Sequence, residues 1–219
     1  KKDDVITLST YGELQLGPYG GAGMGATVKL TLQKKIEALV DVLRESSVTA
    51  KDGVFALPLS ESFVTIMSLP ASAEEDISPR VNVEARKYIP VPISDVVLEW
   101  SEITQGSEQA TLSREVLLVA IQNQSLSEVK TLLDTINMTS KPAEIELFSA
   151  LRAVTKQSDT SIALIDLGAS MSKLYISEGG FLRRLHRIQF GGAFATNTIA
   201  TQLQISFEEA ENMKRNYNP

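Results

Sequence analysis

The sequence contains no cysteine, one histidine and no long apolar run. Without cysteine the chain has no disulfide, no thiolate ligand for a metal and no cysteine nucleophile. A serine–histidine triad would have to use His186, and no Gly-x-Ser-x-Gly motif accompanies it. No apolar run reaches the roughly 18 residues that span a bilayer. We therefore expect no direct membrane insertion and assign any membrane association to a partner.

Positive charge is also scarce. The chain has 21 Lys and Arg residues against 27 Asp and Glu residues, which gives a formal net charge of −6. Such a surface repels phosphate backbones, so we expect no nucleic acid partner. The hydrophobic content of 43% is enough for one large domain or two small ones, each with its own core.

Strand and helix patterns alternate along the chain and predict the α/β class. Thr31 and Ser206 are suitable helix N-caps, and Glu209 would complete a capping box with Ser206. Apolar periodicity predicts helices over 32–43, 73–88, 126–136, 148–154, 193–203 and 207–217. Alternating or continuous apolar runs predict strands over 5–9, 14–16, 53–57, 63–69, 96–103, 115–121, 143–147, 161–165, 172–176 and 182–190.

Residues 17–25 are rich in glycine. A phosphate-binding loop of the Gly-x-x-x-x-Gly-Lys-Ser/Thr type would need a lysine and a hydroxyl residue leading into a helix. That pair is missing here, so the segment is interpreted as a mobile loop.

One predicted hairpin turn carries residues suited to an anion. Gly168 and Ala169 are small enough for backbone N–H groups to approach a phosphate, and Ser170 and Ser172 add hydroxyl groups. Asp166, at the end of the preceding strand, could orient a water bound to magnesium, since Mg²⁺ prefers carboxylate and water ligands. An ordinary hairpin turn is the alternative, and the spacing alone favours it.

Two weaker features follow this turn in the chain. Gly191 and Gly192 lead directly into a helix, whose first N–H groups could hold an anion. Glu211 and Lys214 lie three residues apart and therefore share one face of the next helix. A solvated ion pair is the simpler interpretation of Glu211 and Lys214. The order of the three features is more informative than any one of them.

That order resembles the actin-like ATPase superfamily. In those proteins the hairpin turn is the second phosphate loop, and the Glu-x-x-Lys helix contacts the ribose and base of ATP. The stretch from Phe190 to Lys214 is similar to both the FtsA and the PilM families. The middle of the chain distinguishes the two, because Glu84–Val96, with its Tyr-Ile-Pro segment, is close to the PilM pattern. Residues 57–70, 116–121 and 143–146 fit that pattern too.

The resemblance implies an actin-like (ribonuclease H-like) ATPase fold with an inserted FtsA/PilM-type small α+β subdomain. The resemblance implies three parts. Part of the first actin-like subdomain is formed by residues 1–58, rejoined by about 141–158. The insertion is formed by residues 59–140, and part of the second actin-like subdomain by residues 160–219. The first phosphate loop and the adenine loop have no counterpart in these 219 residues. We therefore expect a fragment that is truncated at both ends and retains half of a nucleotide site.

The function implied by the resemblance is assembly of the type IV pilus. The full-length protein would bind ATP and Mg²⁺, and would capture the cytoplasmic N-terminal peptide of PilN in a groove between the first and inserted subdomains. It would be a cytoplasmic scaffold, peripheral to the inner membrane through its partner, with other pilus platform proteins as further candidate partners. Aromatic and proline residues near Tyr88 to Pro92 would help to shape the groove, although Tyr88 fits a core position equally well.

We expect at most weak ATPase activity in the full-length protein, none in this fragment, and assign no catalytic residue. The alternatives are an FtsA-like membrane tether of cell division and an ATPase of the sugar-kinase branch. The latter would need a catalytic carboxylate between the two halves, and the sequence offers no clear one.

A few other residues carry narrower predictions. The basic run around His186 is interpreted as the exposed face of a hairpin, with phosphate binding as the alternative. Trp100 is predicted to be a core residue, with a partner contact as the alternative. Lys173 follows the candidate turn and is predicted to face solvent, with phosphate as the alternative.

Overall fold

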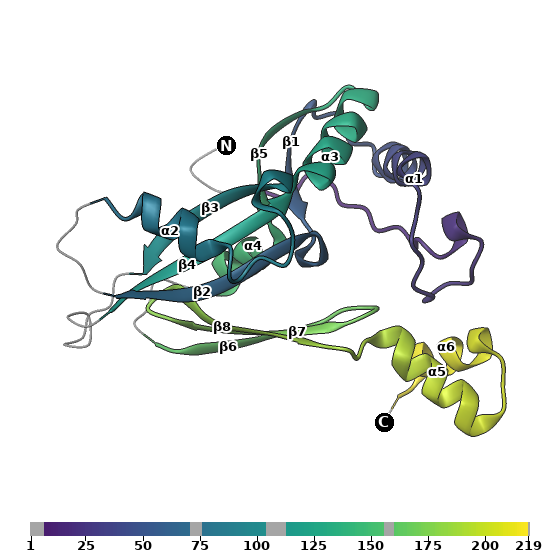
Figure 1. Ribbon diagram of the computed structural model, residues 1–219. Coiled ribbons are helices and arrows are strands. Elements are labelled where there is room, and N and C mark those ends of the chain that lie inside the picture. The colour runs from purple at the N-terminus through teal and green to yellow at the C-terminus, as the bar shows by residue number, and fades with distance from the viewer. Residues whose placement is uncertain (1–6, 71–75, 104–112, 156–159, 219) are drawn as a thin grey trace.

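The computed structural model describes residues 7–70, 76–103, 113–155 and 160–218. In this part of the chain the strands form three sheets (Figure 1): β1 with β5, the order β2-β4-β3, and the order β6-β7-β8. Figure 1 shows α2 on the outer side of the β2-β4-β3 sheet, and α5 and α6 beyond one end of the β6-β7-β8 sheet. Within the described residues no helix combines the length and apolarity needed to cross a bilayer.

The first half of the chain contains 3₁₀ helix η1 (Pro18–Gly20), α1 (Leu32–Glu45), β1 (Asp52–Leu57), η2 (Leu59–Glu61), β2 (Ser62–Pro70), α2 (Ser78–Ala85), η3 (Ile93–Asp95) and β3 (Val96–Ile103). The second half contains β4 (Ser113–Gln122), α3 (Asn123–Thr135), β5 (Thr139–Ile145), α4 (Glu146–Val154), β6 (Ile162–Leu167), β7 (Ser172–Glu178), β8 (Phe181–Ile188), α5 (Gly192–Leu203) and α6 (Phe207–Asn216). Most predicted elements are present with small shifts at their ends. The capping box of Ser206 and Glu209 is confirmed.

The predicted strands near the N-terminus are not formed in the described residues. Residues 5 and 6 lie outside those residues, and 7–16 belong to no strand. An isolated strand leaves its backbone groups unpaired, and here the segment contacts other parts of the chain through side chains. The hydroxyl of Thr10 donates to the carbonyl of Ser46, 2.6 Å away.

The helix predicted over 73–88 is shorter. Residues 73–75 lie outside the described part, and α2 begins at Ser78. The carboxylate of Asp76 accepts hydrogen bonds from the backbone and the hydroxyl of Ser78, at 2.9 and 2.6 Å, which holds the chain at the helix entrance. The helix ends at Ala85, five residues before Pro90, which could not continue it.

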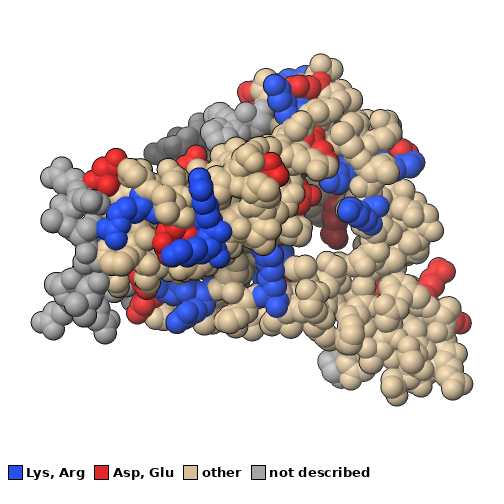
Figure 2. Space-filling model, viewed as in Figure 1, with Lys and Arg blue, Asp and Glu red and all other residues tan. Residues whose placement is uncertain are grey.

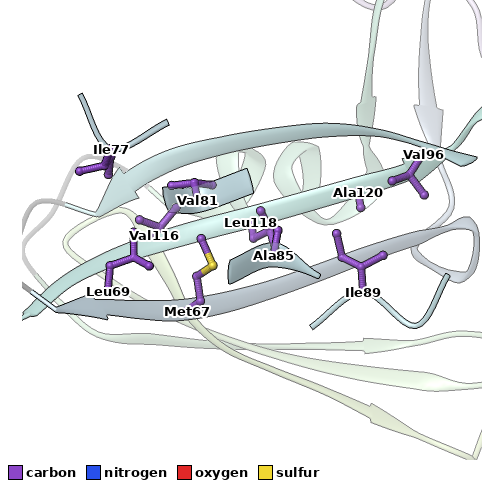
Figure 3. Packing of buried hydrophobic residues seen from close by; sticks show 10 residues of the cluster. All are labelled: Met67, Leu69, Ile77, Val81, Ala85, Ile89, Val96, Val116, Leu118 and Ala120. Carbon is purple, nitrogen blue, oxygen red and sulfur yellow. The ribbon is translucent and has the colours of Figure 1, made fainter. Parts of the chain in front are cut away.

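The β2-β4-β3 sheet buries apolar side chains on both faces. On one face, Val116, Leu118 and Ala120 of β4 pack against α2, as Figure 3 shows. The alternate residues, Leu117 and Val119, point to the opposite face and contact the second core. This double burial explains why β4 is a continuous apolar run in the sequence.

The second core surrounds α4. Leu147 and Leu151 of this helix pack with Tyr175 and Leu182 of the β6-β7-β8 sheet. Because the β4 residues of the opposite face also contact this cluster, α4 joins the two sheets. β1 pairs in parallel with β5, so the chain just before residues 59–140 lies beside the chain that follows them. The predicted subdomain boundaries at 58 and 141 lie close to these two strands, and the division into subdomains stays a prediction.

Replacing Leu118 with Ala should lower the free energy of unfolding by about 2–5 kcal/mol, because its side chain is 1% exposed and deletion leaves a cavity between β4 and α2. Urea denaturation measures the loss. Leu203→Ala is the matched control, because Leu203 is 52% exposed, and its effect should stay within about 0.5 kcal/mol. Equal effects of the two changes would contradict the core as described.

Candidate functional site

The candidate hairpin turn lies in the wall of a pocket of about 530 Å³. The opposite wall comes from the segment before α1, which Figure 1 shows facing α5 and α6, and Figure 2 shows the surface hollowed between these parts. Among the residues predicted to form the site, the structure brings together Gly168, Ala169, Ser170, Gly192, Glu211 and Lys214 on the pocket wall. This volume is within the range of small-ligand sites.

Three of the predicted residues are not on that wall. Ser172 is buried, and its hydroxyl donates to the carbonyl of Phe190 at 2.7 Å. Gly191 is packed so closely that a Cβ there would lie 2.5 Å from the carbonyl oxygen of Ala169. Asp166 is directed towards Lys173. Ser172 and Gly191 therefore hold the turn against α5.

The first two N–H groups of α5 are not free to bind an anion. The N–H of Gly192 donates to the carbonyl of Gly168 at 3.0 Å, and the N–H of Ala193 donates to the carbonyl of Ala169 at 2.9 Å. The prediction that these groups are free is wrong, because the hairpin turn already satisfies them. The same bonds fix the turn relative to α5.

Glu211 is the centre of a charged cluster on α6. Its side chain is only 5% exposed and accepts hydrogen bonds from Thr196, Lys214 and Arg215, at 2.6, 2.6 and 2.7 Å. Burial raises the pKa of this carboxyl, but the hydrogen bonds from Lys214, Thr196 and Arg215 outweigh burial and lower it to about 2. Lys214 also donates to the carbonyl of Gly192 at 3.1 Å, which ties α6 to the start of α5.

The glycine-rich segment reaches this cluster. Gly25 has φ of +77°, and a Cβ there would lie 2.6 Å from Oε1 of Glu211. Its N–H donates to the side-chain carbonyl of Gln15 at 3.2 Å. Only glycine combines this backbone conformation with this close approach. Sequence reasoning missed the contact, because a glycine-rich run signals special backbone conformations without naming the residue that they approach.

Lys173 was predicted to face solvent, but it is mostly buried. Its side chain is 12% exposed, and its ammonium group donates to Glu146 at 2.7 Å and to Asp166 at 3.0 Å. Burial lowers the pKa of Lys173, but the hydrogen bonds to Glu146 and Asp166 more than offset this effect and raise it. Register explains the error, because Lys173 pairs with Asp166 across β6 and β7 on the face that packs against α4.

This arrangement does not fit a magnesium site at Asp166. The carboxylate is already paired with Lys173, and it is absent from the pocket wall. The described residues also contain no group of three or more acidic or histidine side chains that could hold a metal ion. Lys214 and Arg215 supply positive charge to the pocket, but Glu211 neutralises much of it.

A second hollow, of about 340 Å³, lies between β2 and β8. Tyr88 and Ile89, from the Tyr-Ile-Pro segment, contribute to its wall. Tyr88 is 43% exposed, so it is a surface residue and does not belong to the core. His186 and Arg184 are exposed, as predicted for the face of a hairpin, while the guanidinium of Arg187 donates to backbone carbonyls near the start of β2.

The sequence pattern of the family described as type IV pilus assembly protein PilM matches residues 26–218. The chain belongs to the PilM family. Among solved structures, the PilM–PilN type IV pilus biogenesis complex matches with a TM-score of 0.68 and 22% sequence identity, over 83% of this chain and 55% of that chain. This member of the PilM family thus spans about half the length of the protein that it matches.

A weaker match is the cytoplasmic domain of EpsL, an inner membrane component of the type II secretion system of Vibrio cholerae. It has a TM-score of 0.48 and 16% identity, over 70% of this chain and 56% of that chain. The PilM match alone confirms the predicted fold class: the chain has the mixed α/β, actin-like fold of its family.

Glu211 predicts a pH dependence of stability. Because its pKa in the folded state is below that of the unfolded chain, its ionised form contributes stability above about pH 4.5, and this contribution is lost as the pH falls towards 2. The difference in unfolding free energy between the wild type and Glu211→Gln should be roughly 2–4 kcal/mol at pH 7 and should shrink between about pH 5 and pH 2.

Denaturation curves across this range measure the effect. Glu99→Gln is the control, because Glu99 is exposed and has no ion-pair partner in the part of the chain that the structure describes. A difference for Glu211→Gln that stays constant down to pH 2 would contradict the proposed role of its charge.

Proposed function

We propose that this protein acts in assembly of the type IV pilus by holding the cytoplasmic N-terminal peptide of a PilN-type membrane protein. The observation that carries the proposal is the PilM family match over residues 26–218, together with a shared fold with the PilM of a solved PilM–PilN complex. The role is that of a scaffold. A tethered partner would bring the protein to the cytoplasmic face of the inner membrane.

Peptide capture makes modest chemical demands. An extended peptide needs unpaired backbone groups along a strand edge and a few apolar hollows for alternate side chains. The hollow beside Tyr88 is lined by the partly buried apolar residues Phe63 and Leu185, with the core residues Ile89 and Leu118 behind them, and it opens at the edge strand β2. The Tyr-Ile-Pro segment, which carries the resemblance to PilM in the sequence, therefore lies at a surface suited to this task.

The peptide hypothesis is tested with a fluorescently labelled synthetic peptide of the cognate PilN N-terminus. Anisotropy titration of the 219-residue chain should give saturable binding, whereas a scrambled peptide of the same composition should not bind. Addition of ATP should leave the affinity unchanged, because the charged cluster of Glu211 is separate from the hollow beside Tyr88. Equal binding of the two peptides, or binding of neither, would refute the proposal and favour the FtsA-like alternative.

The pocket at the hairpin turn suggests nucleotide binding as a second candidate function of the full-length protein. For the 219-residue chain, however, we propose that Mg-ATP binds weakly or not at all. The N–H groups of Gly192 and Ala193 are used by the turn, and Asp166 is paired with Lys173. The 219 residues contain no second Asp-x-Gly turn to hold the phosphates from the other side. The remaining contacts do not offset the cost of immobilising and desolvating the nucleotide.

Calorimetric titration with Mg-ATP should therefore show a dissociation constant well above 1 µM, which corresponds to roughly −8 kcal/mol. Any residual binding should be weakened by Lys214→Gln, which removes a cation from the pocket wall, and unaffected by Lys130→Gln on the exposed surface of α3. Affinity near 1 µM or tighter would show that the pocket suffices by itself.

A further inference from the structure

A row of charged side chains crosses the β6-β7-β8 sheet on one face. In the register of the sheet, Asp166 of β6 lies opposite Lys173 of β7, and Lys173 lies opposite Arg187 of β8. Residues paired in this way direct their side chains to the same face. Helix α4 covers this face, and the ammonium of Lys173 reaches Glu146, the first residue of that helix. The row and the helix therefore meet at one polar junction.

The ammonium group of Lys173 lies between two carboxylates. It donates to Oε1 of Glu146 at 2.7 Å and to Oδ2 of Asp166 at 3.0 Å. Oε1 of Glu146 also accepts the N–H of Leu59 at 2.9 Å, so the same contact holds the chain that enters β2. Lys173 is the most enclosed of the three charged groups, at 12% exposed against 34% and 39% for Glu146 and Asp166. Its raised pKa keeps the ammonium charged at neutral pH.

The junction also has a charge balance of its own. Tyr175 lies beside it, fully buried, and the charged groups that act on its hydroxyl include Lys173, Asp166, Glu146 and Arg187. These four groups are two cations and two carboxylates, so their formal charges cancel. A divalent ion would add positive charge close to Lys173, where burial weakens screening by water and salt. The junction therefore disfavours a divalent ion as long as Lys173 is charged.

The two carboxylates have the chemistry of a divalent-ion site if the lysine is taken away. Mg²⁺ is held in many proteins by one or two carboxylates together with water molecules, and Mn²⁺ accepts the same ligands. Asp166 lies near the end of β6, just before the turn at 168–171, and Glu146 contacts the same ammonium from α4. Lys173 thus decides whether this pair of carboxylates is open to a metal ion.

We infer that Lys173 is a built-in cation of the turn at 168–171, and that its ammonium replaces a divalent metal ion between Asp166 and Glu146. Lys173 is therefore a specificity-determining residue, because any anion that binds at this turn does so without a bridging metal ion. This role requires neither the partner peptide nor a nucleotide, and it is tested with the metal ion alone.

Electron paramagnetic resonance of Mn²⁺, whose free signal is lost when the ion binds, tests the inference on the 219-residue chain. Lys173→Ala removes the ammonium and leaves space between the carboxylates. It should bind Mn²⁺ roughly tenfold more tightly than the wild type, with one added ion per chain. The wild type should have the same thermal unfolding midpoint in EDTA and in millimolar MgCl₂. Lys173→Ala should unfold at a lower temperature in EDTA and recover part of the loss in MgCl₂, because the ion binds the folded chain.

Further variants locate the ion. Lys173→Met removes the charge but fills the space, so it should be destabilised without recovery in MgCl₂. Lys173→Arg keeps the charge and should not respond to the metal ion. Adding Asp166→Asn to Lys173→Ala should abolish the gained Mn²⁺ site, because one carboxylate is lost. Lys130→Ala, at an exposed lysine of α3, is the matched control and should change neither the Mn²⁺ signal nor the response to MgCl₂.

Two results would overturn the role of Lys173. One is binding of Mn²⁺ by the wild type as tightly as by Lys173→Ala, and the other is a folded Lys173→Ala that gains no Mn²⁺ site. If Lys173→Ala is unfolded in both solutions, the other two single variants at this position decide. Greater stability of Lys173→Arg than of Lys173→Met supports the built-in cation, and equal or lower stability overturns it. Failure of peptide binding would leave each of these outcomes unchanged.

Discussion

The carboxylate of Glu146 joins the parts of the structure that carry both candidate sites. At the start of α4 it accepts hydrogen bonds from the backbone N–H of Leu59, at 2.9 Å, and from the ammonium of Lys173, at 2.7 Å. Lys173 in turn contacts Asp166, in the strand that leads into the candidate turn. The chain just before β2, helix α4 and the β6-β7 hairpin are thus held by one partly buried group. Lys173 is the most buried member of this set, at 12% exposed, so its charge depends most on its two carboxylate partners.

The position of α4 makes this polar contact possible. Its apolar residues fill the space between two sheets, so its first turn lies where the sheets approach each other. Tyr175, beneath the same contact, is fully buried with a hydroxyl that has no hydrogen-bond partner in the described residues, and burial raises its pKa to about 12. A neutral phenol in this place avoids a further charge among Lys173, Asp166 and Glu146. The ammonium of Lys173 thus pairs with both carboxylates, which remain partly exposed to solvent.

Local sequence patterns predicted most helices and strands, but they could not predict contacts between segments far apart in the sequence. The apolar run of β4 and the capping box at Ser206 depend on neighbouring residues, and both were found. The strands predicted at 5–9 and 14–16 failed where they can be examined, because alternation alone supplies no partner strand. The burial of Lys173 and the approach of Gly25 to Glu211 depend on how sheets and loops pack over long sequence separations. The turn was recognised by its glycine, but the order of residues could not show that its carbonyls accept hydrogen bonds from the first N–H groups of α5.

Trp100 gives the β2-β4-β3 sheet a spectroscopic signal of its own. It is the only tryptophan in the chain, lies on β3 opposite Leu118, and packs against the core beneath α2. Its intrinsic emission therefore reports on the surroundings of the β2-β4-β3 sheet, while far-ultraviolet circular dichroism averages over all helices and strands. Unfolding curves from the two signals coincide only if this sheet and the rest of the chain unfold together. A displaced tryptophan curve would show that the sheet is an independent cooperative unit despite the contacts that α4 makes with both layers.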